Sequence, residues 1–88
     1  MVAKAGSEQA VGQALRDLVK PTRAEPGCTS YELFSSAADP ATFITVETWT
    51  SQADLDAHLQ SPHVAEALRV SGDHLAQAPG IHPLRPVS

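Results

Sequence analysis

The amino-acid sequence predicts an α+β domain of the ferredoxin-like class, with the order strand, helix, strand, strand, helix, strand. Two helical patterns alternate with segments rich in Thr, Val, Ile and aromatic residues. A short loop, residues 37–40, joins the two middle segments and leaves no room for a helical crossover. These two strands are therefore expected to pair antiparallel, in one sheet with the helices on one of its faces.

The N-terminal part of the chain is expected to form a short strand and a helix. The strand covers residues 2–5, and Ser7 is the N-cap of the helix that follows. Apolar residues recur there at the spacing of a buried helical stripe. They are Val11, Ala14, Leu15, Leu18 and Val19. Pro21 is expected to kink or stop the helix, and Pro26-Gly27 to form the turn after it.

The middle of the chain is a predicted hairpin, with strands over residues 28–35 and about 42–50. Alternation places Tyr31 and Leu33 on one face of the first strand and Phe34 on the other. The second strand presents one alternating set on a single face: Phe43, Thr45, Glu47 and Trp49.

Two serines mark the helical region after the hairpin. Ser51 and Asp54 form a capping box that opens a helix, and Ser61 before proline restarts the helix over residues 62–71. Gly72 is its expected C-terminal cap. The final strand, residues 81–87, contains two prolines and is expected at a sheet edge or at a contact with another subunit.

The size of the chain favours a single domain over residues 1–88 that associates with a second copy. A domain of this length buries a small share of its surface, and oligomerisation is a common remedy. Cys28 is the only cysteine, so a disulfide within the chain is impossible. The four histidines show no spacing typical of a metal site, and no metal is expected.

Charge and hydropathy exclude several kinds of partner. The net charge is −4 and the six basic residues are scattered, which argues against nucleic-acid binding. The sequence has no apolar run of membrane-spanning length and no signal peptide, so no membrane association is expected. A lone free thiol is typical of a reducing compartment, and we expect a cytoplasmic protein.

Three sequence blocks carry a family resemblance. They are E-P-G-C at 25–28, E-x-W at 47–49 and A-H-L-x-S-x-H at 57–63. Their order and spacing resemble the antibiotic biosynthesis monooxygenase family over about residues 8–87. The resemblance implies a homodimer in which two sheets close into a barrel. It also implies a pocket between sheet and helices where a phenol or quinol is oxygenated without metal or flavin. The first strand is shorter than is usual in the family.

The predicted catalytic residues are His58 and His63. His58 shares a helical face with Leu55 and Leu59, and is either a base in the pocket or a packed histidine with a solvated tip. His63 lies in the first turn of a helix, where the dipole favours the neutral imidazole that a base requires. A structural role at the helix start is the alternative.

The predicted substrate-binding residues are Trp49, Tyr31, Glu47 and Phe34. Trp49 forms either a pocket wall or an aromatic anchor of the core or the dimer interface. Glu47 either orients a histidine or, as we favour, pairs with an arginine across the dimer. Tyr31 is a hydrogen-bond donor to a substrate oxygen or a half-buried strand residue without function.

These observations lead to one main hypothesis and two alternatives. The main hypothesis is a cofactor-independent monooxygenase that oxidises a small aromatic, phenolic or quinol substrate with molecular oxygen. The first alternative is a non-catalytic dimeric module that binds a small ligand or a partner protein. The second is a haem-binding relative, which is disfavoured because Leu68 stands near the place of that branch's axial histidine.

Overall fold

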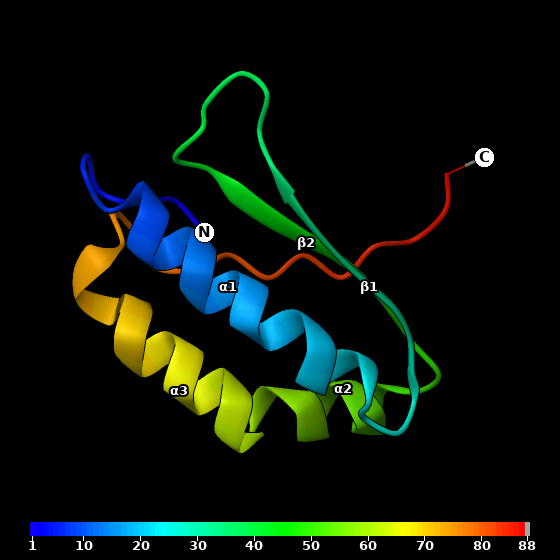
Figure 1. Ribbon diagram of the computed structural model, residues 1–88. Coiled ribbons are helices and arrows are strands. Elements are labelled where there is room, and N and C mark those ends of the chain that lie inside the picture. The colour runs from blue at the N-terminus through cyan, green and yellow to red at the C-terminus, as the bar shows by residue number, and fades with distance from the viewer. Residues whose placement is uncertain (88) are drawn as a thin grey trace.

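The computed structural model describes residues 1–87 and shows three helices packed against a two-stranded hairpin (Figure 1). The elements follow the order α1 (Glu8–Arg23), β1 (Cys28–Ser35), β2 (Phe43–Trp49), α2 (Gln52–Leu59), α3 (Pro62–Ser71) and the short 3-10 helix η1 (Gly72–His74). Helices α1 and α3 lie side by side, and α1 also packs on β1. The α+β class with an antiparallel sheet is confirmed.

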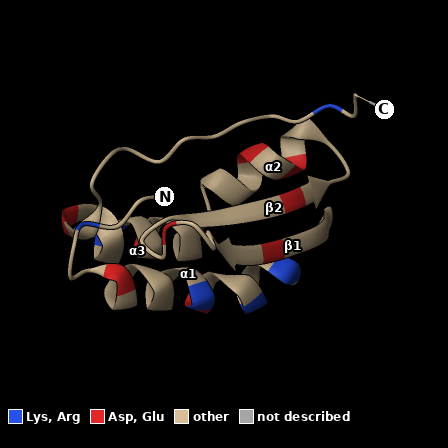
Figure 2. Cartoon of the chain, turned by 90° about the horizontal axis from the view of Figure 1, so that it is seen from above, with Lys and Arg blue, Asp and Glu red and all other residues tan. Residues whose placement is uncertain are grey.

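Helix α1 supplies most of the core, on the face predicted from its apolar spacing. Val11, Leu15 and Leu18 are buried and contact Val64 and Ala67 of α3. The same helix carries Lys20 and Arg23 in its last turn, where cations are favourable (Figure 2).

Two predictions about α1 hold only in part. The helix continues through Pro21 to Arg23, because the proline sits near the end and the fully buried Thr22 keeps the last turn packed. Ser7 occupies the N-cap position, but its side chain makes no capping bond. Its hydroxyl instead pairs with Nδ1 of His74, 3.0 Å away, because η1 brings that ring to the helix start.

The hairpin has the predicted alternation. Tyr31 pairs with Glu47 and Leu33 with Thr45 on the face toward the helices. The opposite face carries three half-exposed apolar side chains: Phe34, Ile44 and Val46. The sheet therefore has one covered face and one apolar face that this chain leaves open.

The two terminal strands predicted from the sequence do not form within residues 1–87. The first is reduced to two isolated bridges, Val2 with Thr42 and Ala3 with Leu75. Residues 81–87 have no strand structure and are exposed. The physical reason is the absence of a backbone N–H at Pro79, Pro83 and Pro86, which deprives this segment of a continuous ladder.

Local capping sets the starts of α2 and α3, as predicted. The Ser51 hydroxyl accepts from the backbone N–H of Asp54 at 3.2 Å, and the Ser61 hydroxyl accepts from that of Val64 at 3.4 Å. Gly72 follows α3 directly. Between residues 1 and 87, no helix is both long and apolar enough to cross a membrane.

Candidate functional site

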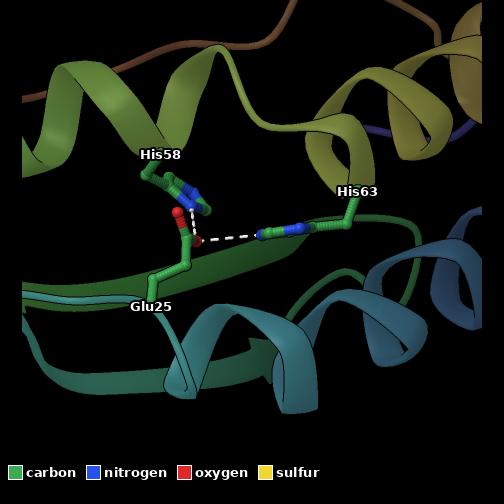
Figure 3. Close-up of side chains that lie close together, drawn as sticks. All are labelled: Glu25, His58 and His63. Atoms are coloured by element: carbon green, nitrogen blue, oxygen red, sulfur yellow. Dashed lines mark hydrogen bonds and ion pairs between the residues drawn. The ribbon is translucent and has the colours of Figure 1, made fainter.

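The Glu25 carboxylate joins two histidines that come from different helices (Figure 3). Its Oε2 atom lies 2.5 Å from Nδ1 of His58 and 2.9 Å from Nε2 of His63. The His58 side chain is 4% exposed, Glu25 15% and His63 24%, so the cluster leads from the interior to the surface. One oxygen thus serves both imidazoles.

A tight turn positions Glu25. The residue lies between α1 and β1, where its N–H donates to the Thr22 carbonyl at 3.0 Å. Gly27 follows with φ of 82°, a conformation that glycine adopts without strain. A Cβ atom at Gly27 would lie 2.2 Å from Oδ2 of Asp54, so the turn fits closely against the start of α2. This contact holds Glu25 opposite the end of the same helix, where His58 lies.

His58 is surrounded by aromatic and acidic side chains. Its ring lies 4.8 Å from that of Trp49, at an interplanar angle of 35°, and 5.9 Å from that of Tyr31 in an edge-on arrangement. Its second nitrogen, Nε2, lies 4.0 Å from Oε1 of Glu47. The two ring nitrogens of His58 therefore each face a carboxylate, from Glu25 and from Glu47.

Glu47 is held on both carboxylate oxygens. The Trp49 indole N–H donates to Oε1 at 3.0 Å, and the Thr45 hydroxyl donates to Oε2 at 2.7 Å. Two roles were predicted for Glu47, contact with a histidine and pairing with an arginine across a dimer. Within the chain, Glu47 belongs to the polar network around His58.

Burial and neighbouring charge set the ionisation of three groups. Burial raises the pKa of Glu25, but the hydrogen bonds and charges of His58 and His63 outweigh it and hold the pKa below its usual range. Burial, together with the Glu47 charge, raises the pKa of Tyr31 to about 12, so its hydroxyl stays protonated. Burial also raises the pKa of the Cys28 thiol, which fits a packed, unreactive cysteine.

A pocket of about 410 Å³ lies between β2, α2 and residues 80–84. Its lining combines apolar side chains with a few polar groups. The apolar side chains that line it include Trp49, Leu55, Leu59, Ile81 and Leu84. The polar ones include Thr45, Glu47 and His82. His58 does not line this pocket but lies behind Trp49 and Glu47.

A second cavity of about 400 Å³ lies between α1 and α3, with His63 at its wall. Most of the remaining lining is apolar, including Ala14, Leu18 and Val70. The polar cluster thus stands between two hollows, with His63 facing this one and Glu47 facing the other.

The cluster also has the chemistry of a metal-ligand set. One ligand atom each of Glu25, His58 and His63 lies within 4.8 Å of the others. The sequence spacing of the histidines gave no sign of this set, because the fold and not the sequence brings these groups together. Two imidazoles and a carboxylate are ligands that divalent transition metals accept.

The structure brings together five of the six predicted site residues: His58, His63, Trp49, Tyr31 and Glu47. Phe34 is separate, since it is 51% exposed on the opposite face of the hairpin. Glu25 was not predicted as a site residue. The sequence signal that could have identified it is its place at the head of the E-P-G-C block, which was interpreted as a turn and as part of the family resemblance.

Comparison with known proteins places the chain in a family. The family model for antibiotic biosynthesis monooxygenase matches residues 1–70. An uncharacterized protein of Synechocystis sp., sll1783, is 37% identical over 59 residues, which are 67% of this chain and 40% of that protein. The chain thus spans less than half the length of that relative.

A relative with a more similar length is Rv0793 of Mycobacterium tuberculosis, which is named as a candidate monooxygenase. It is 37% identical over 76 residues, which are 85% of this chain and 74% of that protein. Its structure superposes with a TM-score of 0.85 and 30% identity over 99% of this chain and 91% of that chain. The structure of PA3566 from Pseudomonas aeruginosa gives a TM-score of 0.82 at 32% identity, over 88% and 78% of the two chains. The chain therefore belongs to the antibiotic biosynthesis monooxygenase family.

Proposed function

We propose that this protein is a monooxygenase that oxidises a small phenolic or quinol substrate with molecular oxygen and needs no bound cofactor. The observation that carries the proposal is the pocket walled by Trp49 and Glu47, where apolar and polar side chains are mixed, with the buried His58 directly behind these two residues. Relatives named as candidate monooxygenases support the reaction type.

The chemistry requires an electron-rich substrate and little from the protein. Loss of the hydroxyl proton gives an anion that can pass one electron to oxygen, after which the two radicals combine at carbon to form a peroxide. The peroxide takes back the proton, its O–O bond breaks, and water leaves with the hydrogen of that carbon, so that one oxygen atom stays on the ring as a carbonyl. The protein binds the ring, accepts the proton and keeps water away. A pocket that combines an aromatic and aliphatic wall with polar side chains of fixed position fits these tasks.

We assign the proton-accepting role to His58. Glu25 holds the Nδ1 side of the ring, which leaves Nε2 directed toward Glu47 and the pocket. A proton taken from the substrate hydroxyl by Glu47 can pass to Nε2, and Glu25 stabilises the imidazolium that results. His63 shares the Glu25 carboxylate and is the outer member of the catalytic cluster.

Two aromatic residues are proposed to shape the site. Trp49 lines the pocket and stacks against His58, so it positions the substrate ring and the base together. Tyr31 keeps its hydroxyl proton and packs against the edge of His58. Phe34 has no place in this pocket within one chain.

We further propose a homodimer located in the cytoplasm. Three half-exposed apolar side chains on the outer face of the hairpin support the dimer, since a second copy of the same face would bury them: Phe34, Ile44 and Val46. The single free thiol supports the compartment.

The test is a single-turnover experiment with oxygen control. The protein is mixed with a naphthalene quinol without oxygen, ¹⁸O₂ is then admitted, and mass spectrometry measures label in the product. We expect label incorporation faster than in buffer, and its loss in His58→Gln. His74→Ala is the matched control, because that ring bonds Ser7 away from the pocket. A rate equal to buffer would leave the alternative, a non-catalytic ligand-binding module.

A further inference from the structure

Glu47 is the only carboxylate among the described residues that line the 410 Å³ pocket. Neither lysine nor arginine lies in that part of the lining, and His82 is its one basic side chain. The pocket therefore has an acidic wall without a permanent cation to balance it.

The Glu47 carboxylate has a fixed orientation. Thr45 and Trp49 donate one hydrogen bond each, to different oxygens. An ionised carboxylate offers about four acceptor positions, so at least one on each oxygen is free after these bonds. Glu47 can accept a hydrogen bond from a ligand without giving up its protein partners.

The charges around Glu47 disfavour an anionic ligand in the pocket. Its side chain is 22% exposed, so solvent screens it only in part. Behind His58 stands a second carboxylate, Glu25, which its histidine partners keep ionised. An anionic group on a ligand would meet repulsion from the nearer carboxylate and find no arginine or lysine in the described lining.

We propose that Glu47 makes the pocket selective for neutral aromatic rings that carry a hydroxyl donor, against carboxylated rings of the same size. The hydroxyl donates to Glu47 while the ring lies against Trp49, Leu55 and Leu59. This inference rests on the proposed function, because it takes the pocket as the substrate site.

The experiment compares three ligands of one shape: 2-naphthol, 2-naphthoate and naphthalene. At neutral pH they present a hydroxyl donor, an anion and neither. Trp49 is the only tryptophan, so its indole N–H gives a single cross-peak in a ¹H–¹⁵N spectrum. That N–H is bonded to Glu47, and its shift reports directly on the carboxylate. We expect 2-naphthol to bind about tenfold tighter than 2-naphthoate or more, and tighter than naphthalene.

Two variants assign the selectivity to one residue. Glu47→Gln removes the charge and should bring the two affinities within about threefold of each other. Glu32→Gln makes the same charge change on the outer face of the same hairpin, where Glu32 pairs with Arg23, and should keep the wild-type ratio.

Each outcome bears on a separate claim. Equal binding of naphthol and naphthoate by the wild-type protein overturns the selectivity and leaves the proposed pocket intact. An unchanged ratio in Glu47→Gln overturns the role of Glu47. If none of the three rings moves the Trp49 signal, the proposed substrate pocket fails, and this inference fails with it. The wild-type comparison stands even if Glu47→Gln does not fold.

Discussion

The Oε2 atom of Glu25 lies 2.5 Å from Nδ1 of His58, although 33 residues separate them in the chain. The same oxygen lies 2.9 Å from Nε2 of His63, on the next helix. A single carboxylate thereby ties the loop after α1 to both α2 and α3. Removal of its charge should affect folding and the proposed chemistry together.

Glu25→Gln should destabilise the protein by about 2 kcal/mol, because an amide oxygen cannot replace a charged acceptor shared by two imidazoles. Urea unfolding followed by circular dichroism measures the change. Glu66→Gln is the control, since Glu66 pairs with Arg69 on the exposed face of α3. The loss of stability in Glu66→Gln should be much smaller, because ion pairs between exposed side chains contribute little to stability. Equal costs at the two positions would contradict a special role for Glu25.

The lowered pKa of Glu25 predicts how the loss of stability in Glu25→Gln depends on pH. The folded pKa lies below the ordinary 4.5, so the ionised group stabilises the folded state at pH values above 4.5. That stability is lost as the pH falls through the folded pKa. The gap in unfolding free energy between wild type and Glu25→Gln should therefore narrow as the pH falls below 4.5. If the difference in unfolding free energy between the two proteins stayed constant at pH values well below 4.5, the pKa of Glu25 would not be lowered in the folded protein.

The parts of the site that follow from local rules were predictable from the sequence. Ser51 and Ser61 place the starts of α2 and α3 through capping, and these starts put His58 and His63 near each other. Strand alternation placed Tyr31 and Leu33 on one face of the hairpin and Glu47 and Trp49 on one face of its partner strand. In the observed register, these residues of the two strands lie on the same face of the hairpin, which is the face toward the helices.

The remaining features depend on contacts distant in sequence. The role of Glu25 could not be predicted from its neighbours in the sequence, because both of its partners lie more than 30 positions along the chain. The last strand was predicted at a sheet edge or at a contact with another subunit, because its two prolines lack the N–H groups that a full ladder needs. Within the described residues of one chain, this segment forms no strand. Phe34 was predicted to bind substrate, although its place in the alternation puts it on the other face of the sheet.

Two glycines allow the fit of the Glu25 turn to be tested. Gly27 and Gly6 have nearly equal φ angles, 82° and 85°. A Cβ at Gly6 would meet nothing within 4 Å, whereas one at Gly27 would collide with Asp54. Gly6→Ala should cost about 1 kcal/mol from backbone strain alone. Gly27→Ala should cost about 3 kcal/mol or more, and the difference measures the contact. Equal losses would mean that the turn does not rest on α2.

The outer face of the hairpin predicts the oligomeric state. Val46 is 45% exposed on that face and lies beside Phe34 and Ile44. We expect a dimer in sedimentation equilibrium at micromolar concentration, and a monomer for Val46→Glu, because a dimer would bury the new charge without a partner.

Val70→Glu is the matched control for this experiment. Val70 is 40% exposed, but it lies on α3 beside the second cavity, away from the outer face of the sheet. The same substitution there should leave the dimer intact. Dissociation by both variants would indicate general destabilisation, and a monomeric wild type would contradict the use of this face for pairing.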